Sequence, residues 1–489
     1  MQTTHTPQGS PESTHPHAQT RLEHDLIGER AVPHHAYYGI HTLRAVENFP
    51  VTGTPISIYP DLINALARIK QAAALTNHEL GLLDKTRCGA IVAACAEIID
   101  GRLHDQFVVD VIQGGAGTST NMNANEVIAN RALELLGHHR GEYSHLHPNE
   151  HVNLSQSTND VYPTALKIAG IVGIHGLIEA MAVLRLAFAE KADAFSNILK
   201  MGRTQLQDAV PMTLGQEFQT YAVMLGEDEE RLREASKLIC EINLGATAIG
   251  TGITTHPDYA ALVCKHLCAL THLPLMTAPN LIEATQDCGA FVQLSGVLKR
   301  VAVKLSKTCN DLRLLSSGPR AGLGEINLPA MQAGSSIMPG KVNPVIPEVV
   351  NQIAFEVIGN DLTVSFAAEA GQLQLNAFEP VIAHSLFKSV THLRQGCLIL
   401  AERCVKGITA NAEKLRQSVT SSIGLVTALN PYIGYENATA LAQEALQTGA
   451  SVYDLVIAKK LLDKEQLDAI LDPAVLTAPS ALLKVPKKQ

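Results

Sequence analysis

The segment 165–198 has no proline and carries a long apolar stripe. Apolar side chains recur at helical spacings of three and four from Ile174 to Phe188. If the whole segment is helical, it is about 50 Å long at 1.5 Å per residue. Similar long patterns occupy 213–243, 280–313 and 347–405. Strand signals are few and short, so the chain is predicted to be all-α (mainly helical), with a bundle of long, near-parallel helices.

Composition supports long packed helices. Of 489 residues, 46% are apolar but only 4% are aromatic, and there is no Trp. The core must therefore come from Leu, Ile, Val, Ala and Met. Pro380 is expected to kink or interrupt the last long pattern. The net charge is −9, and no basic tract of the kind that binds nucleic acid is present.

Changes in composition suggest three domains after a tail. Residues 1–20 are polar and predicted to be a disordered tail. We place an N-terminal helical domain at 21–156, a central long-helix domain at 157–410, and a small C-terminal helical domain at 411–489.

The location is expected to be cytoplasmic. The tail has no apolar core of a secretory signal and is not basic like a transit peptide. No uninterrupted run of about 18 apolar residues occurs, so no membrane span is expected. The nine cysteines are dispersed, without a C-x-x-C pair, which indicates free thiols in a reducing compartment.

The loop 334–344 carries the strongest chemical signal. It reads Gly-Ser-Ser-Ile-Met-Pro-Gly-Lys-Val-Asn-Pro. Its prolines forbid a continuous helix, and its glycines permit unusual backbone angles. Two hydroxyls, the Lys341 ammonium and the Asn343 amide are groups that can hold a small carboxylate and remove a proton beside it.

This loop resembles the signature of the fumarase/aspartase superfamily, Gly-Ser-x-x-Met-x-x-Lys-x-Asn, and the likeness extends over about residues 23 to 470 in order and character. Further similar stretches are Met201–Phe218, Leu314–Gly322 and Ala368–Asn376. The resemblance implies a three-domain subunit and a homotetramer with a core of helices from all four subunits. It also implies that each active site is assembled from three subunits, on loops that close over substrate.

Two more loops match family positions in the first part of the chain. The glycine-rich run 114–126 enters a helix, and the resemblance points to Thr118 as a substrate contact. A plain cap by Ser119 or Asn121 is the alternative. The run 155–160 also suggests a cap, whereas the resemblance implies that Ser157 and Thr158 hold a substrate carboxylate and that Asn159 contacts the amino or hydroxyl end.

A third loop, 202–211, matches the family with Thr204 and Gln205, which the resemblance places at the leaving-group end of the substrate. Arg203 and Asp208 are interpreted as a structural ion pair.

These groups suit an elimination that passes through a carbanion. Removing the C3 proton of a dicarboxylic amino acid requires the charge to spread into the neighbouring carboxylate, and donors aimed there stabilise it. Thr118, Ser157, Thr158 and Ser336 are the candidate donors. Lys341 and Asn343 would hold the other carboxylate, and the resemblance makes Ser335 the general base. A turn-capping Ser335 is the alternative.

Gln205 favours release of ammonia over release of water. Hydroxide is a poor leaving group that needs an acid, and an amide cannot donate a proton at useful pH. An ammonium group needs none. We therefore expect a carbon–nitrogen lyase that converts L-aspartate to fumarate and ammonium. The alternatives are a class II fumarase acting on malate, or a catalytically silent structural protein of this fold.

The sequence also gives expectations for cofactors and partners. No organic cofactor is expected, and activation by a divalent metal such as Mg²⁺ rests on family resemblance only. No metal-ligand cluster is recognised in the sequence, and His138 and His139 are interpreted as solvent-exposed polar residues. The role of Glu348 is open, because the histidine that its counterpart partners in fumarases is absent. The partners are the small-molecule substrate and identical subunits, with no nucleic acid and no membrane.

Overall fold

The computed structural model describes residues 20–477 and 479. The chain divides into two compact units. Unit 1 comprises Met1–Ala169, Cys240–Cys288 and Ala367–His384, and unit 2 comprises Gly170–Ile239, Gly289–Phe366 and Ser385–Gln489. The predicted tail lies outside the described residues up to residue 19. The three-domain boundaries near 156 and 410 stay a prediction.

Unit 1 contains short and medium helices with a few short strands. Its elements are β1 (Thr20–Asp25), β2 (Gly28–Pro33), α1 (Ile40–Asn48), η1 (Ile56–Ile58), α2 (Pro60–Glu79), α3 (Lys85–Ile99), η2 (His104–Gln106), α4 (Thr118–Leu135), the π-helical turn η3 (Pro148–Val152), β5 (Glu241–Ile242), α7 (Thr247–Gly250), α8 (Tyr259–Thr271), β6 (Met276–Thr277) and α9 (Leu281–Gln286). The helix α5 (Thr158–Ala194) begins in unit 1 and continues into unit 2.

Unit 2 contains the long helices and a group of short ones. Its further elements are β3 (Leu199–Thr204), β4 (Gln207–Thr213), α6 (Leu214–Leu238), α10 (Gly289–Leu315), β7 (Ile326–Asn327), α11 (Val345–Glu369), α12 (Glu379–Arg403), η4 (Val405–Gly407), β8 (Thr409–Ala410), α13 (Ala412–Ser421), α14 (Leu425–Ile433), α15 (Tyr435–Thr448), α16 (Val452–Ala458), α17 (Lys464–Ile470) and α18 (Pro473–Leu476). The short helices enclose their own apolar cluster, which includes Leu425, Leu441 and Leu467.

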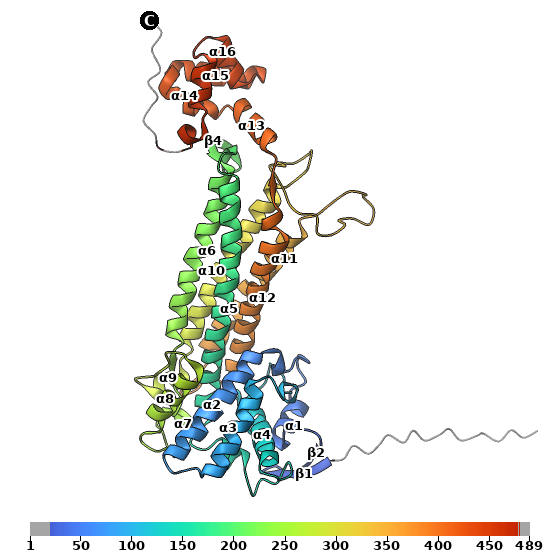
Figure 1. The fold of residues 1–489 in the computed structure, drawn as a ribbon, viewed down its shortest axis with the longest axis vertical. Helices are drawn as coiled ribbons and strands as arrows, with labels where there is room; N and C mark the ends of the chain where they lie inside the picture. Colours follow the sequence, from blue (N-terminus) through green and yellow to red (C-terminus); the bar gives the residue numbers. More distant parts are fainter. Residues whose placement is uncertain (1–19, 478, 480–489) are drawn as a thin grey trace, which may run out of the picture. The chain divides into compact units, whose positions relative to one another are not determined.

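The predicted bundle is confirmed. Figure 1 shows α5, α6, α10, α11 and α12 running side by side. Polar bridges join successive helices at buried positions. Asp228 on α6 accepts from Arg300 Nε of α10 at 2.7 Å, and Asp361 on α11 accepts from Ser295 Oγ of α10 at 2.8 Å. Within residues 20–477 the strands form two-stranded sheets, as the weak strand signals predict.

The helix α5 begins earlier than its apolar stripe indicates. Its 37 residues start at Thr158, before Pro163, and correspond to about 55 Å. By length and composition alone α5 could cross a membrane, since an 18-residue window has a mean hydropathy of 1.7. The side chains of Ile174, Leu177 and Leu184 are fully buried inside the chain. We therefore interpret α5 as the core helix of the bundle.

The predicted interruption of the last long pattern is confirmed, but it lies before Pro380. Residues 370–378 separate α11 from α12. Pro380 lies in the first turn of α12, where its missing N–H has no intrahelical partner to lose.

Glu379, the first residue of α12, is a buried carboxyl within unit 1. Burial raises the pKa of Glu379 to about 8 from its ordinary value of 4.5, and the charge of Lys167 opposes this shift. Lys167 itself donates from Nζ to the Glu241 carbonyl at 2.7 Å. A carboxyl with a raised pKa contributes stability that is fully present below the unfolded-state pKa and is lost as the pH rises through the folded-state pKa.

We therefore expect Glu379→Gln to gain stability relative to the parent as the pH rises from 4.5 to about 8. Urea unfolding at several pH values measures this difference. The exposed Glu369→Gln is the matched control on α11. A Glu379→Gln effect that does not change with pH would contradict the assignment of a neutral buried carboxyl.

Candidate active site

The segment that leads into α4 has an unusual backbone. Gly115, Ala116 and Gly117 have φ angles of +90°, +54° and +87°. A Cβ on Gly117 would lie 2.3 Å from Cδ1 of Tyr162, so this position requires glycine. Thr118 begins the helix and is exposed, with its hydroxyl donating to the Gly115 carbonyl at 2.7 Å.

Gly117 occupies the N-cap position of α4, and the side chain that serves the first turn comes from before the helix, since Gln113 Oε1 accepts from the Thr120 N–H at 3.1 Å. The alternative that Ser119 or Asn121 caps this helix is therefore wrong. The physical reason is that the glycine-rich turn places its own backbone at the cap position, before either polar side chain.

The start of α5 is capped by the residues that were expected to cap it. Ser157 Oγ accepts from the Asn159 N–H at 3.2 Å, and Asp160 accepts from the Ser157 N–H at 3.0 Å. Thr158 Oγ1 accepts from Asn121 Nδ2 at 3.1 Å. Since Asn121 lies one turn after Thr118, this bond brings the starts of α4 and α5 together. Capping and substrate binding are compatible here, because Ser157, Thr158 and Asn159 stay partly exposed.

Lys70 lies beneath these two helix starts and was not predicted from the sequence. Its fully buried ammonium donates to Asn121 Oδ1 at 2.7 Å, Asn153 Oδ1 at 2.9 Å and Gln156 Oε1 at 2.9 Å. Burial lowers the pKa of Lys70 to about 7, against the opposing charge of Asp160. A lysine inside the apolar pattern of α2 is the signal that could have indicated this network.

Asp160 fixes a second segment beside the start of α5. It is fully buried and accepts from the Gly245 and Thr247 N–H groups at 3.1 and 3.0 Å. Burial raises the pKa of Asp160 to about 6. Thr247 and Ala248 have φ angles of +41° and +36°, and the Ala248 carbonyl accepts from Asn159 Nδ2 at 2.7 Å. Strained non-glycine backbone is retained only where its surroundings enforce it, which is common at functional sites.

Thr204 and Gln205 lie at the tip of the β3–β4 hairpin in unit 2. Thr204 pairs with Gln207, which leaves Gln205 and Leu206 as a two-residue turn. Both turn residues have positive φ, +52° and +63°, in a geometry that normally favours Asn and Gly. Thr204, Gln205 and Leu206 are all exposed in the single chain.

The interpretation of Arg203 and Asp208 as an ion pair is wrong. Arg203 Nη1 pairs instead with Oε1 of the buried Glu325 at 2.6 Å. Asp208 accepts from Ser422 Oγ at 3.0 Å. The two residues are partners in strand register. The buried Glu325 carboxylate also forms an ion pair with Lys200 Nζ at 2.7 Å. A buried carboxylate needs such cations more than an exposed aspartate does.

The loop 334–344 is non-helical, as predicted. Ser335 Oγ accepts from the Met338 N–H at 2.8 Å and from the Ile337 N–H at 3.2 Å. The loop is closed by Asn343 Nδ2, which donates to the Gly334 carbonyl at 2.8 Å. Two N–H groups aimed at one hydroxyl oxygen stabilise an alkoxide, and they also form an ordinary serine turn. The geometry is therefore compatible with both interpretations of Ser335.

The predicted residues fall into two groups. Unit 1 holds Thr118, Ser157, Thr158 and Asn159, which hydrogen bonds of Asn121 and Asp160 hold near one another. Unit 2 holds Thr204, Gln205, Ser335, Ser336, Lys341 and Asn343. Among the described residues of unit 2, no hydrogen bond or ion pair joins the hairpin tip to the loop 334–344. Ser336 and Lys341 are exposed, and Asn343 and Glu348 are half-buried.

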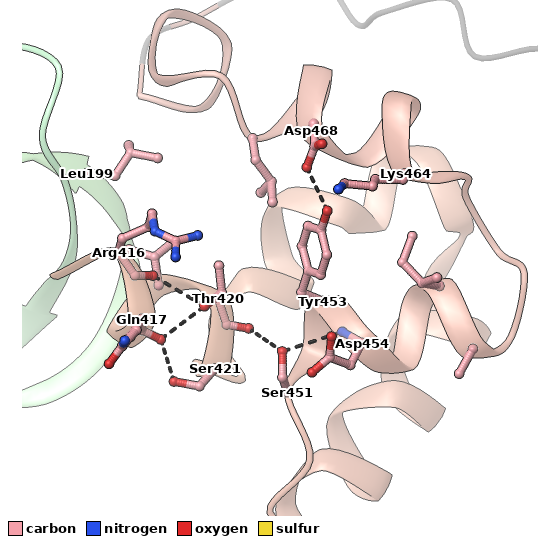
Figure 2. A pocket seen from close by; sticks show the side chains of 14 residues that line it. Leu199, Arg416, Gln417, Thr420, Ser421, Ser451, Tyr453, Asp454, Lys464 and Asp468 are labelled. Atoms are coloured by element: carbon pink, nitrogen blue, oxygen red, sulfur yellow. Dashed lines mark hydrogen bonds between the residues drawn. The ribbon is translucent and has the colours of Figure 1, made fainter. Parts of the chain in front are cut away.

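A large pocket of about 990 Å³ lies elsewhere, among α13, α16 and α17 of unit 2. Figure 2 shows polar side chains along it, with the Tyr453 hydroxyl donating to Asp468 at 2.7 Å. Apolar groups such as Val419 and Ile457 complete its wall. None of the predicted site residues lines this pocket, so it is separate from the candidate active site.

Comparisons with known proteins give a consistent result. The family model described as "Lyase" matches residues 28–359, and the model "Fumarase C C-terminus" matches residues 425–478. An aspartate ammonia-lyase from Helicobacter pylori is 60% identical over 95% of this chain and 99% of its own length. One from Escherichia coli is 55% identical over 94% of this chain and 96% of its own length.

Solved structures agree in fold. A structure described as fumarate lyase:delta crystallin from Brucella melitensis, bound to cobalt, has a TM-score of 0.92 at 55% identity. The match covers 94% of this chain and 100% of that one. A class II fumarase from Schistosoma mansoni has a TM-score of 0.87 at 36% identity, covering 93% of this chain and 98% of its own.

Proposed function

Since this chain belongs to the fumarase/aspartase superfamily and is a carbon–nitrogen lyase, we propose that its reaction is the reversible elimination of ammonia from L-aspartate to give fumarate. The observation that carries the proposal is the high identity to aspartate ammonia-lyases over nearly the whole chain, together with the complete motif from Gly334 to Asn343.

The proposed mechanism begins with removal of the C3 proton by Ser335. Its oxygen already accepts two backbone N–H bonds, from Ile337 and Met338, and these would stabilise the alkoxide that acts as base. Loss of the proton places negative charge on the adjacent carboxylate. Donors that meet this charge more strongly in the transition state than in the ground state lower the barrier. Thr118, Ser157, Thr158 and Ser336 are assigned to this task.

The other end of the substrate needs an anchor and a leaving-group site. Lys341 is assigned as a point charge for the second carboxylate, with Asn343 beside it. Both lie on an exposed loop, which suits a segment that closes over substrate. Thr204, Gln205 and Asn159 are assigned to the departing ammonium, which needs hydrogen-bond acceptors and no acid.

The test of this function compares the turnover of aspartate with that of malate. The expected preference for aspartate depends on Gln205. We expect the protein to form fumarate from aspartate readily and to convert malate at most in traces. The reason is that the amide of Gln205 cannot protonate a leaving hydroxide. Absorbance of fumarate measures both reactions in one assay. The matched variant Gln205→His should keep aspartate turnover within about tenfold, since a neutral imidazole still accepts a hydrogen bond.

The alternatives are decided by the same assay. Hydration of fumarate at a rate comparable with its amination would refute the ammonia-lyase assignment and support a class II fumarase. No turnover of either substrate by a folded, assembled protein would support a catalytically silent structural role.

A homotetramer with shared sites is part of the proposal. The outer face of α11 carries four large apolar side chains at helical spacing, which we name the α11 stripe. Their exposed fractions are 61% for Phe355, 37% for Ile358, 59% for Leu362 and 66% for Phe366. An exposed apolar patch of this kind is typical of an interface, and we assign it to contact with a second copy of the chain, which would carry the same patch.

Activation by Mg²⁺ stays a proposal that rests on the family resemblance alone. Mg²⁺ prefers oxygen ligands in octahedral geometry. Within residues 20–477, the one group of three or more potential ligand side chains that converge is His138, Glu142 and His145, which offers nitrogen as well as oxygen. No step of the proposed mechanism uses Mg²⁺ or an organic cofactor.

We also propose a cytoplasmic location, with aspartate, fumarate and ammonium as the small-molecule partners.

A further inference from the structure

The loop 137–147 connects α4 to the π-helical turn η3, within unit 1. It brings His138, Glu142 and His145 together, with ligand atoms all within 4.8 Å of one another. The two imidazole rings stack with centroids 3.8 Å apart and planes inclined by 9°. His138 Nδ1 lies 3.5 Å from Glu142 Oε2. All three side chains are at least partly exposed, so an ion could reach them.

We propose that His138, Glu142 and His145 bind one divalent transition-metal ion, with Zn²⁺ as the best match. Two imidazoles and one carboxylate are ligands that Zn²⁺ and Co²⁺ accept, and water would complete a tetrahedral shell. Bonds of about 2.0–2.1 Å set neighbouring ligand atoms about 3.3 Å apart in that geometry. The observed separations, up to 4.8 Å, exceed this value, so binding requires the three side chains to move toward one another.

The backbone of the loop is held in place on both sides of Glu142. Gly141 donates its N–H to Asn130 Oδ1 at 2.8 Å, and Asn130 Nδ2 donates to the Tyr143 hydroxyl at 3.1 Å. The His145 carbonyl accepts from Arg87 Nε at 2.7 Å. These contacts fix the origins of the ligand side chains, which reduces the ordering cost of binding an ion.

One further contact orients the carboxylate. The His139 N–H donates to Glu142 Oε2 at 3.0 Å, on the same carboxylate oxygen that lies 3.5 Å from His138 Nδ1. Ligating carboxylates usually carry such an outer hydrogen bond. His139 thus contributes its backbone only, and its side chain is not part of the cluster.

Nearby cations already have their own counter-charges. Arg140 Nε pairs with Glu134 at 2.8 Å, and Arg131 pairs with Glu97 at 2.7 Å. Arg87 pairs with Asp84 at 2.8 Å. The repulsion that an added divalent ion would meet is therefore reduced.

The metal site is distinct from the candidate active site. It follows the C-terminal end of α4, whereas Thr118 begins that helix. The 18 residues of α4 correspond to about 27 Å. A bound ion would therefore join two ends of a loop and stabilise it, with no part in the elimination.

The test is a titration of full-length, EDTA-treated protein with Zn²⁺ by calorimetry. We expect the double variant His138→Asn/His145→Asn to lose one bound equivalent that the parent retains. His139→Asn is the matched control on the same loop and should retain it. The triple variant His5→Asn/His15→Asn/His17→Asn controls for histidines near the N-terminus and should also retain it.

Spectroscopy gives an independent readout. Co²⁺ should give the strong ligand-field bands of four-coordinate geometry with the parent and with His139→Asn, and not with the double variant. If the double variant misfolds, as judged by far-UV circular dichroism in EDTA, Glu142→Gln takes its place. Unchanged Zn²⁺ stoichiometry and affinity in the cluster variants, or loss in the N-terminal triple variant alone, would overturn the proposal.

Discussion

Ser335→Ala is expected to lower kcat by about 10²- to 10⁴-fold, the range that a positioned general base contributes. The variant keeps the backbone of the loop but removes the oxygen that accepts from Ile337 and Met338. Steady-state fumarate formation measures kcat. Because the serine is assigned to proton removal and not to binding, the dissociation constant for aspartate should change far less than kcat.

Two controls distinguish a role of Ser335 as the general base from a role in holding the turn of its loop. Ser418→Ala removes a partly exposed serine hydroxyl from α13, outside the candidate site, and should leave kcat unchanged. Binding of aspartate to Ser335→Ala by calorimetry shows whether the loop still forms. If the variant retains more than a small fraction of kcat, Ser335 is a turn residue and another group is the base. If binding is lost together with kcat, the hydroxyl acts by holding the loop.

Placing charges on the α11 stripe is expected to abolish assembly and, with it, nearly all activity. Burying one large apolar side chain is worth about 1.5–3 kcal/mol, so Leu362→Glu/Phe366→Glu removes a large favourable term from each copy of the interface. The charges would also be buried without partners. Activity should fall with assembly if each site needs residues from several subunits, as the resemblance to the family implies.

Light scattering during size exclusion gives the mass of each species, and fumarate formation gives its activity. Leu446→Glu makes the same kind of change at an exposed leucine on α15 and should stay assembled and active. A double variant that keeps the parent's mass would show that the α11 stripe is not an interface. A dissociated variant with full activity would show that one chain contains a complete site.

Much of the architecture follows from the sequence, because long helices depend on local periodicity. The stripe from Ile174 to Phe188 predicts a buried helix, and the structure buries it. The sequence predicts a break in the last long pattern at Pro380. The structure has this break earlier, because α11 ends just before Gly371 and α12 begins at Glu379. The loop 334–344 is recognisable because the order of its glycines, prolines and polar residues already excludes regular structure.

Contacts between distant residues were decided only by the tertiary structure. Periodicity cannot show that Lys70 of α2 meets the amides of Asn121, Asn153 and Gln156, since that needs three segments to pack around one ammonium. Periodicity also cannot show that Arg203 forms its ion pair with Glu325 and not with Asp208, its partner in strand register.

The proposed metal site and the α11 stripe show the same difference between what the sequence and what the tertiary structure determines. The sequence contains two histidines and a glutamate close together, which did not indicate a metal site, and four apolar residues at helical spacing. Folding then brings the first set within 4.8 Å through a turn at Gly141, and leaves the second exposed in the single chain. Residue chemistry and local periodicity are properties of short segments, whereas burial and proximity depend on how the segments pack.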